Sequence, residues 1–434
     1  MQPEFQLVAQ RILDFLMNLR NLNSPNADVR MKGFLTRTTV DDALAWIGST
    51  LSAGARNAIE VISLKDAAGR ILAEDIISEV NVPGFNRSMM DGYALRAEET
   101  YGATSYNALP FNIIGTSLPG KPFTGTVARG TAVRIMTGAP MPNGATAVLP
   151  VEGTEAQNDI MSAMSDVSVG KHVGVIGEDV ATGATILTAG RTLRPQDLGV
   201  LSSIGRGTIP VVKRPVVRIL ITGNELLPAG TSPEGFQIAD ANGPMLHSLV
   251  SRDGGIAAMP PLIHDSREQL QAAMLEPADV ILVSGGSSVG EEDHAPQILA
   301  QHGTLAIHGI AMRPSSPAGM GILNGAFVFL LPGNPVSCLC AYDFFAGRVI
   351  RALGGRNENW PYRRITATLT RKIVSTVGRV DYARVKLDGT AAEPIAVSGA
   401  SVLSSTTQAD GFMIIPANSE GFAANSTVDV FCYD

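Results

Sequence analysis

The chain has 434 residues, of which 45% are hydrophobic and 17% charged, and its formal net charge is −7. Single cores rarely grow beyond about 250–300 residues, so this length predicts several folding units. The apolar fraction, together with 45 Gly and 26 Pro, excludes a disordered or fibrous chain and indicates a globular protein with many turns. An acidic balance without a run of Lys and Arg argues against nucleic acid as a partner.

Cysteine use and hydropathy narrow the class further. Cys338, Cys340 and Cys432 are too few for a disulfide framework and lack the paired spacing of a zinc site, so we expect buried thiols. No run of 18 apolar residues occurs, so no membrane-spanning segment is predicted. Charged residues interrupt the apolar pattern of the first thirty positions, which argues against a secretory signal and makes the cytoplasm the expected location.

The first part of the chain predicts an extension followed by two kinds of domain. Residues 1–34 form the extension, within which Val8–Leu19 has the pattern of a short amphipathic helix. Thr39 is a suitable N-cap for a helix over Thr39–Ile47, because it precedes two aspartates in the first turn. Short β-rich runs separated by Gly, Pro and Asn predict a small β domain over 81–169. The flanking segments, 35–80 and 170–212, are assigned to an elongated N-terminal domain.

The second half of the chain has the alternating pattern of an α/β domain. Val216–Thr222, Val280–Ser284 and Ala326–Leu331 are apolar runs, each followed by a Gly-rich loop and separated by helix-length segments. This alternation predicts a parallel, doubly wound sheet covered by helices on both faces, over residues 213–356. Short alternating strands then predict a closing β domain over 357–434. The expected fold class is therefore multidomain α/β plus β.

The segment Leu330–Ser337 ends an apolar strand and opens a helix that runs towards Leu353. Asn334 is placed to be the N-cap, and Pro335 takes the first helical position, where its missing N–H does no harm. A helix N-terminus at the carboxyl edge of a parallel sheet attracts an anion. An ordinary strand-to-helix turn would have the same sequence, and the turn alone favours that interpretation.

A second loop, Ser284–His294, follows another apolar strand and contains three glycines. Such glycines let backbone N–H groups approach a ligand, so two such loops side by side predict a phosphate or pterin pocket. Glu291, Glu292 and Asp293 would place carboxylates beside it, where they could hold Mg²⁺. A solvated first helical turn explains these three acids equally well.

A third strand end brings Glu225 to the same edge of the sheet. Asp240 and Asn242 follow, and we expect both to cap the next helix. Asp265 has two interpretations. With Glu268 three residues later it forms a capping-box-like start, and it could equally be a metal ligand.

Seven motifs occur in an order that resembles the molybdenum insertases, a family that includes bacterial molybdopterin molybdenumtransferases and the carboxyl-terminal domain of gephyrin. The resemblance covers roughly Thr38 to Tyr433. Any single motif is weak, and the specificity comes from all seven in register. The motifs are Pro83-Gly84-Phe85 with Ser88-Met89-Met90-Asp91-Gly92-Tyr93-Ala94, Arg134-Ile135-Met136-Thr137-Gly138-Ala139, Gly177-Glu178-Asp179, Thr222-Gly223-Asn224-Glu225-Leu226, Ser284-Gly285-Gly286, Gly290-Glu291-Glu292-Asp293 and Leu331-Pro332-Gly333-Asn334-Pro335-Val336-Ser337.

The resemblance implies an enzyme that inserts molybdate into adenylylated molybdopterin with Mg²⁺-dependent release of AMP. It also implies an elongated four-domain subunit that forms a homodimer, a cleft between the sheet domain of one subunit and the small β domain of the other, a barrel-like last domain, and contact with the adenylyltransferase partner. The implied catalytic residues are Asp91, Thr137, Asp179, Glu225 and Asp293. The implied metal ligands are Glu225, Asp265 and Asp293. The implied cofactor-binding residues are Ser284, Gly285, Gly286, Ser288, Arg313, Pro332, Gly333, Asn334, Pro335, Ser337 and Arg384.

Several of these residues have plainer explanations. Asp91 could be a turn residue, Thr137 a strand-end hydroxyl and Arg384 a surface arginine on a strand. No serine, cysteine or histidine nucleophile is required by the reaction, and none is assigned.

The chain departs from the family in a segment that usually carries three lysines. Gly309–Pro317 has only Arg313 there, with Ser315 and Ser316 in place of cations. Because the substrates are strongly anionic, this loss should weaken binding. With these lysines lost, three functions remain compatible with the sequence. The chain could be an active but divergent enzyme, a paralogue that acts on a variant cofactor, or a non-catalytic pterin carrier or scaffold. Adenylyl transfer to the pterin is a further alternative, against which the extra β domains argue.

Overall fold

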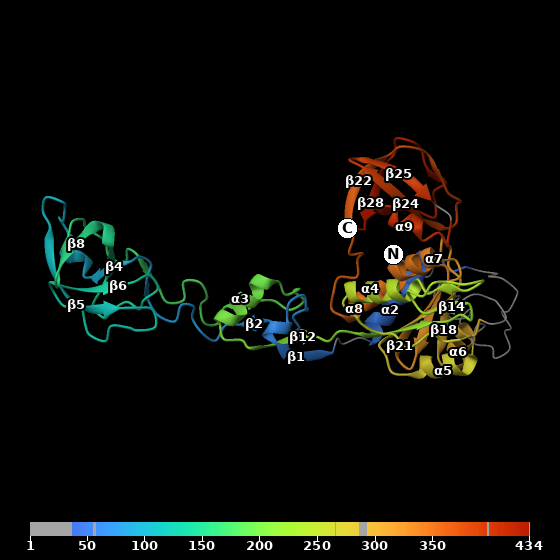
Figure 1. The fold of residues 1–434 in the computed structure, drawn as a ribbon, viewed down its shortest axis with the longest axis horizontal. Coiled ribbons are helices and arrows are strands. Elements are labelled where there is room, and N and C mark those ends of the chain that lie inside the picture. The colour runs from blue at the N-terminus through green and yellow to red at the C-terminus, as the bar shows by residue number, and fades with distance from the viewer. Residues whose placement is uncertain (1–36, 55–57, 265, 286–292, 397–398, 434) are drawn as a thin grey trace, which may run out of the picture. The chain divides into compact units, whose positions relative to one another are not determined.

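The computed structural model describes residues 37–54, 58–264, 266–285, 293–396 and 399–433 (Figure 1). They form two compact units: the β unit, Ile59–Val211, and the sheet unit, which consists of the described residues before Ile59 and those after Val211. The amphipathic helix predicted over Val8–Leu19 lies outside the described residues. No helix in the described ranges is both long enough and apolar enough to span a membrane.

The β unit contains a mixed sheet with the strand order β7-β4-β6-β5-β9-β8. Alternating side chains such as Tyr93, Leu95 and Phe111 fill its core. The β-rich runs that the sequence predicts around 111–114, 132–136 and 146–151 fall on β5, β6 and β7. The strands are β4 (Gly92–Leu95), β5 (Leu109–Ser117), β6 (Thr131–Ile135), β7 (Ala147–Pro150), β8 (Thr154–Gln157) and β9 (Ile160–Ala163).

The rest of the β unit is built from two-stranded pairs and one helix around a second apolar core. Asp197 in the first turn of the helix is buried, and its carboxylate accepts hydrogen bonds from Arg191 Nε at 3.0 Å and Arg194 Nε at 3.2 Å. These bonds lower the pKa of Asp197 well below its usual range. The elements are β1 (Ile59–Ser63) with β12 (Thr208–Val212), β2 (Ile76–Ile77) with β11 (Thr185–Leu187), β3 (Arg87–Ser88) with β10 (Val173–Gly174), and α3 (Pro195–Ser203).

The main sheet of the sheet unit has the order β16-β13-β17-β21-β20-β18. β16, β13, β17 and β21 run parallel, which confirms the predicted parallel sheet, whereas β20 and β18 form an antiparallel edge that the sequence did not predict. β20 also pairs antiparallel with β21, and Asn324 and Gly325, with φ of 49° and 85°, make the tight turn between these two strands. The strands are β13 (Val216–Ile221), β16 (Ile256–Ala258), β17 (Val280–Ser284), β18 (Thr304–His308), β20 (Gly319–Leu323) and β21 (Ala326–Leu331).

Helices cover both faces of this sheet because its strands alternate their apolar side chains between two cores. In β17, Val280 and Leu282 enter the core beneath α4 and the helices that follow β21, whereas Ile281 and Val283 enter the core beneath α5 and α6. Both faces are therefore buried, as the continuous apolar runs predict. The helices are α4 (Asn242–Arg252), α5 (Arg267–Leu275) and α6 (Ala295–His302).

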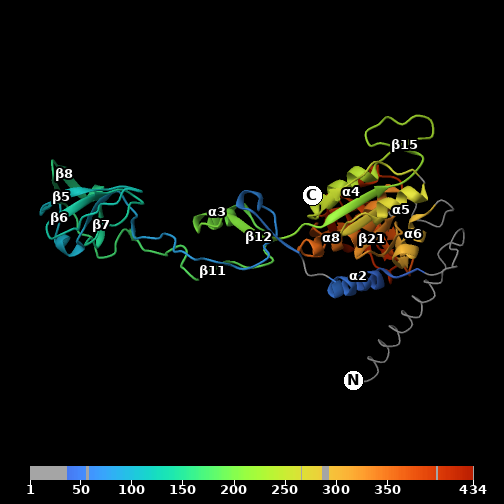
Figure 2. The same ribbon diagram turned by 90° about the horizontal axis from the view of Figure 1, so that it is seen from below.

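Helix α2 (Val40–Gly54) packs against the first of these cores through Val40, Ala43 and Ile47 (Figure 2). Thr39 caps it as predicted, since the Asp42 N–H donates to Thr39 Oγ1 at 3.1 Å. The sequence analysis assigns 35–80 to the elongated domain, and the structure differs for this helix. The reason is its apolar face, which the sheet core buries.

The chain after β21 is helical from Pro335 to Leu353, as predicted. It consists of α7 (Pro335–Ala341), a π-helical turn η4 (Tyr342–Ala346) and α8 (Gly347–Leu353). Cys338 and Cys340 lie on α7 and are buried free thiols, as is Cys432, which confirms the expectation for all three. Burial raises the pKa of Cys338 to about 12.

The end of the chain is a closed barrel in which β24, β25, β22, β28 and β26 pair in a ring that returns to β24. This is the closing β domain that the sequence predicts. β19 (Met312–Arg313), which lies between β18 and β20 of the main sheet, pairs in parallel with β24 and joins the barrel to the sheet domain. The elements are β22 (Arg363–Leu369), β24 (Val380–Asp388), β25 (Ala391–Ala396), β26 (Gly411–Ile415) and β28 (Thr427–Cys432), with β23 (Ile373–Val374), β27 (Gly421–Phe422) and α9 (Ser404–Thr407) beside them.

Candidate active site at the carboxyl edge of the sheet

A cavity of about 600 Å³ lies where β13, β17 and β21 end. The carboxyl edge of a parallel sheet is the usual ligand site in α/β folds, because loops diverge there. The three strand ends that the sequence singles out therefore meet in one place. The lining residues are Ile221, Thr222, Gly223, Glu225, Leu226, Ile238, Ala239, Asp240, Ala241, Asn242, Ser284, Gly285, Asp293, Pro317, Pro332, Gly333, Asn334, Pro335 and Ser401.

Two glycines let the loops of the cavity wall pack backbone against backbone. Gly285 has a φ of 94°, and a Cβ there would lie 2.3 Å from the Thr222 carbonyl oxygen. A Cβ on Gly333 would lie 3.7 Å from Gly285 Cα. Glycine is therefore required at Gly285 by both conformation and space. This confirms that two Gly-rich loops lie together, as the sequence predicts.

Asn242, the first residue of α4, joins the ends of β17 and β21. Its Nδ2 donates to Ser284 Oγ at 2.9 Å and to the Gly333 carbonyl at 2.7 Å. Asp240 behaves as the expected cap, since the Gly243 N–H donates to its carboxylate at 2.9 Å. Asn242 was also expected to cap, and instead its side chain bridges the loops.

Two buried polar atoms of the wall have no hydrogen-bond partner among the described residues: Thr222 Oγ1 and Asn242 Oδ1. The two residues are only 6% and 7% exposed. A buried polar group without a partner costs about 1–3 kcal/mol. Both atoms are inaccessible to solvent, so they lie within the wall behind the cavity surface.

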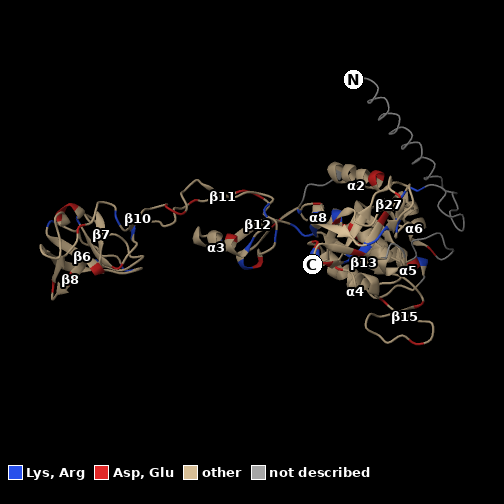
Figure 3. Ribbon diagram, turned by 90° about the horizontal axis from the view of Figure 1, so that it is seen from above, with Lys and Arg blue, Asp and Glu red and all other residues tan. Residues whose placement is uncertain are grey.

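The wall is acidic. Glu225, Asp240 and Asp293 line it, and its described lining includes no lysine, arginine or histidine. The β14–β15 segment (Leu226–Leu227, Ile238–Ala239) projects beside the cavity and carries acidic but no basic residues (Figures 2 and 3).

Glu225 and Asp293 suit a magnesium ion. Mg²⁺ in proteins is usually bound through one or two carboxylates together with substrate phosphates, rather than by a full protein cage. Consistent with this, the described part of the chain contains no cluster of three or more His, Cys, Asp or Glu residues that could hold a metal. Asp265, Gly286, Ser288, Glu291 and Glu292, also named from the sequence, lie outside the described residues.

The turn after β21 has the predicted positions of Asn334 and Pro335 but differs in its hydrogen bonds. Asn334 takes the N-cap position and Pro335 the first helical position, but the Asn334 side chain makes no capping bond. The Val336 N–H, which the sequence analysis leaves open to an anion, donates to the Ala400 carbonyl at 3.0 Å. A loop of the barrel therefore reaches the cavity edge, where Ser401 is part of the lining.

Arg313, Ser337 and Arg384 were predicted to bind the cofactor, but none lines the cavity. Arg313 forms an ion pair with Asp381, a fully buried residue of β24. The Ser337 carbonyl accepts a hydrogen bond from Ser315 and is buried. Arg313 thus binds a strand of the barrel, and Ser337 connects α7 to the segment that contains Ser315.

Arg384 differs most from expectation. The sequence predicted either a cofactor-binding residue or a surface arginine, but the residue is 0% exposed, which fits neither. It lies in β24 where that strand faces the interior between barrel and sheet domain. Burial lowers the pKa of its guanidinium.

In the β unit, Asp91 and Thr137 form an exposed pair. Asp91 Oδ1 accepts hydrogen bonds from the Thr137 N–H at 2.7 Å and from Thr137 Oγ1 at 2.8 Å. These bonds lower the pKa of Asp91. Asp179 is exposed, and its N–H donates to the Val82 carbonyl at 3.0 Å. The fold thus brings Asp91 and Thr137 together across 46 residues, whereas the backbone N–H of Asp179 bonds to Val82.

Sequence reasoning missed Thr222, Pro317 and Ser401 as cavity residues. Thr222 had a signal, because it opens the motif that contains Glu225. Pro317 and Ser401 had none, since only the packing of the barrel on the sheet domain brings them to this edge.

Comparison with known proteins covers both units. Residues 38–205 match the MoeA N-terminal region (domain I and II), 218–352 match the probable molybdopterin binding domain, and 366–432 match the MoeA C-terminal region (domain IV). A molybdopterin molybdenumtransferase of Staphylococcus aureus is 32% identical over 379 residues, covering 85% of this chain and 90% of that protein.

Two further relatives agree. Molybdopterin molybdenumtransferase 2 of Mycobacterium tuberculosis is 34% identical over 384 residues, which is 85% of this chain and 94% of that protein. The crystal structure of a molybdopterin biosynthesis MoeA protein from Pyrococcus horikosii aligns with a TM-score of 0.80 at 30% identity, covering 92% of this chain and 100% of that one. This chain therefore belongs to the molybdopterin molybdenumtransferase family.

Proposed function

We propose that this chain releases AMP from adenylylated molybdopterin in a Mg²⁺-dependent reaction and inserts molybdate into the freed dithiolene. Its family makes it a transferase of molybdenum cofactor biosynthesis. The observation that carries the finer proposal is the cavity at the three strand ends, where carboxylates and Gly-rich loops stand together.

The carboxylates and the loops would have separate tasks. Glu225 and Asp293 would hold Mg²⁺, which supplies charge neutralisation at the phosphate oxygens. The Gly285 and Gly333 loops let the backbone come close to the phosphates. Hydrolysis breaks one P–O bond of the P–O–P bridge between the two phosphates. The oxygen of water joins one phosphorus and the bridging oxygen stays on the other, so that AMP and the pterin phosphate are both released as phosphate monoesters.

The reaction does not use a thiol nucleophile from this chain. Cys338 lies behind Ser284, with 3.8 Å between Sγ and Oγ, and is fully buried. Its raised pKa, about 12, keeps it protonated at neutral pH. This agrees with the expectation that no covalent intermediate forms on the protein.

We further propose that two copies of the chain act together, with Asp91 and Thr137 of one copy completing the cavity of the other. The exposed, preorganised carboxylate of Asp91 supports this role, since an ionised group held by two donors needs no rearrangement to bind. Light scattering should give twice the chain mass, and a strict monomer would contradict the pairing.

The decisive experiment is a single-turnover assay in which the purified protein is mixed with adenylylated molybdopterin, Mg²⁺ and molybdate. AMP should be released, and the product should restore the activity of a molybdoenzyme from which the cofactor has been removed. Binding without AMP release would refute the catalytic proposal and favour a pterin carrier, the second candidate, which the absence of any cation in the described cavity lining supports. The cytoplasmic location and contact with the adenylyltransferase remain predictions, to be tested by cell fractionation and co-purification.

A further inference from the structure

In the β unit, Thr137 meets Asp91 from a tight turn. The Ala139 N–H closes this turn by donating to the Met136 carbonyl at 2.9 Å, so that Thr137 is its second residue. Gly138, the third residue, has a φ of 80°, which is typical of a type II turn and favours glycine there. The turn presents the Thr137 N–H and hydroxyl to the Asp91 carboxylate.

Ser88 joins this turn to the Asp91 arm, the segment that runs from Ser88 to Asp91. The Ser88 carbonyl accepts from the Gly138 N–H at 2.8 Å, and its N–H donates to the Ala139 carbonyl at 2.9 Å. Its hydroxyl donates to the Met90 carbonyl at 2.5 Å and accepts from the Met90 N–H at 3.3 Å. The main chain of Ser88 thus binds the turn, while its side chain binds the residue just before Asp91.

The Asp91 arm is anchored by its main chain at both ends. β3, which contains Ser88, pairs with β10, and the next N–H, that of Met89, donates to the His172 carbonyl at 2.9 Å. At the far end, the Val151 N–H donates to the Asp91 carbonyl at 3.0 Å. Ser88 is only 1% exposed, so its hydroxyl touches no ligand and acts through the arm.

We propose that Ser88 is a positioning residue whose hydroxyl sets the carboxylate of Asp91 against Thr137. The inference rests on the function proposed above, in which this pair completes the cavity of the second copy. A reacting group must be held in its productive orientation, and a displacement of about 1 Å can cost about a hundredfold in rate. Without the hydroxyl, the Met90 peptide is free to rotate, and the Asp91 carboxylate moves away from its two donors.

Ser88→Ala tests this role because it removes the hydroxyl and leaves the main-chain bonds of Ser88 in place. The hydrogen bonds from Thr137 hold the pKa of Asp91 below its usual value, so the variant should raise that pKa. NMR titration of the Asp91 carboxyl carbon measures it. In the same variant, kcat for AMP release should fall about tenfold, and KM should change by less than about twofold.

Ser117→Ala is the matched control. Ser117 is 0% exposed, its carbonyl accepts from the Met136 N–H at 3.3 Å, and its hydroxyl donates to the Pro140 carbonyl at 2.8 Å. This hydroxyl therefore binds the chain just after the turn rather than the Asp91 arm. Both variants should lower the melting temperature, because each loses a buried hydroxyl that is hydrogen-bonded. Only Ser88→Ala should change the pKa of Asp91 and kcat.

Two results would overturn the inference. One is a Ser88→Ala variant in which the pKa of Asp91 and kcat both equal those of the wild type. The other is an equal change of pKa and kcat in Ser88→Ala and Ser117→Ala, which would mean that both serines only stabilise the domain.

These measurements also separate this inference from the proposed function. The titration needs no substrate, so it tests the position of the Asp91 carboxylate in either case. A wild-type protein that releases no AMP, with the pKa of Asp91 raised in Ser88→Ala, refutes the proposed reaction alone. A wild-type protein that releases AMP, with pKa and kcat unchanged in Ser88→Ala, refutes only the role of Ser88.

Discussion

The two ends of helix α4 bury polar side chains in opposite ways. At its start, Asn242 lines the cavity with an acceptor that has no partner among the described residues. At its end, Arg252 and the adjoining Asp253 belong to a buried ionic cluster in which the charges are paired. Asp253 accepts hydrogen bonds from Arg252 Nη2 and from the Tyr342 hydroxyl, both at 3.0 Å. It also forms an ion pair with Arg351, at 2.9 Å from Nη1.

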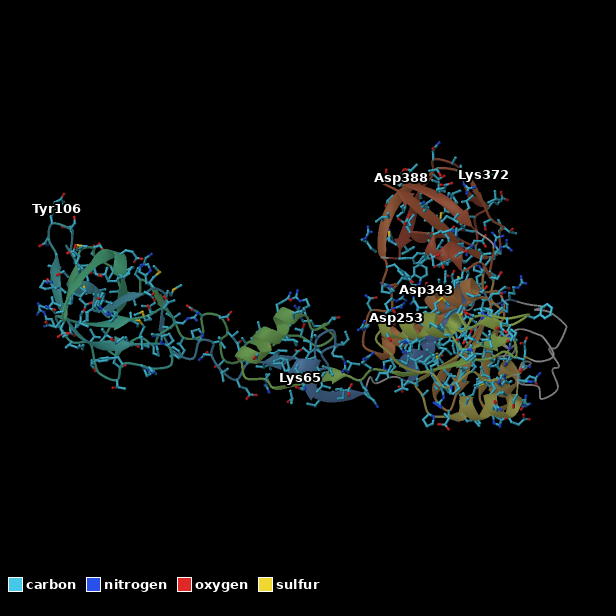
Figure 4. The ribbon with its side chains drawn as sticks, in the orientation of Figure 1. Lys65, Tyr106, Asp253, Asp343, Lys372 and Asp388 are labelled. Carbon is cyan, nitrogen blue, oxygen red and sulfur yellow. The ribbon has the colours of Figure 1, made fainter. Side chains whose placement is uncertain are left out.

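The second carboxylate of this cluster is Asp343, in the π-helical turn. It accepts from the Tyr362 hydroxyl at 2.9 Å and from Arg252 NH2 at 3.3 Å. Asp253 and Asp343 lie where the sheet domain meets the chain that leads into the barrel (Figure 4). The contrast is one of charge: the cluster pairs its carboxylates with arginines, whereas the cavity wall carries carboxylates and no cation among its described lining residues.

The largest expected effect is on stability, at the ionic cluster that follows the end of α4. Asp253→Ala leaves Arg252 and Arg351 buried without their carboxylate, which should lower the free energy of unfolding by about 3–5 kcal/mol. Urea denaturation measures this loss. An exposed acid on the same unit, Asp388 at the end of β24 (Figure 4), gives the matched control: Asp388→Ala should change stability by less than about 0.5 kcal/mol. An equal loss of unfolding free energy in Asp253→Ala and Asp388→Ala would show that the ionic cluster does not stabilise the fold.

At the cavity end the effect should appear in turnover. Asp293→Ala removes a carboxylate from the proposed Mg²⁺ site and should lower the rate of AMP release by about a thousandfold, equivalent to about 4 kcal/mol. The melting temperature should stay close to that of the wild type. Asp91→Ala in the β unit should likewise abolish turnover with the fold intact. Wild-type rates in both variants would show that the assigned carboxylates are not catalytic.

The ionic cluster should also make stability depend on pH. Burial raises the pKa of Asp343 from 3.8 to about 6. Its protonated form therefore stabilises the fold below about pH 4, and this contribution is lost as the pH rises towards 6. The difference of about 2 pKa units corresponds to about 3 kcal/mol.

Asp343→Asn removes that titration. The stability of this variant relative to the wild type should therefore rise by about 3 kcal/mol between pH 4 and pH 7. Denaturation curves at several pH values measure it. A relative stability that stays constant over this range would mean that Asp343 keeps its charge throughout.

The smallest expected effect concerns Asp91 and Thr137, which are exposed and belong neither to the ionic cluster nor to the cavity wall. Hydrogen bonds from the Thr137 N–H and hydroxyl lower the pKa of Asp91. Thr137→Val removes the hydroxyl and keeps the N–H, so the pKa of Asp91 should rise part of the way back to its usual value. NMR titration of the carboxyl carbon measures it, and an unchanged pKa would mean that the N–H alone holds the charge.

Local sequence patterns were sufficient for the parts of the fold that depend on nearby residues. The continuous apolar runs predicted β13, β17 and β21 because strands buried on both faces need apolar side chains throughout. Thr39 and Pro335 marked helix starts because capping chemistry is local. The antiparallel edge formed by β18 and β20 was not predicted. The direction of these two strands depends on tertiary pairing, because the segment between them contains β19, which pairs with the barrel.

The sequence by itself determined the family, the parallel sheet and the edge at which Glu225, Ser284 and Asn334 meet, because strand order and loop position follow from hydrophobic pattern and chain direction. Only the tertiary structure decided which polar atoms are free to bind. It paired Arg313 with Asp381, buried Arg384, and left Thr222 Oγ1 and Asn242 Oδ1 without a hydrogen-bond partner among the described residues. The physical reason is that a hydrogen bond or ion pair depends on distances of about 3 Å between residues far apart in the chain, and only packing sets those distances.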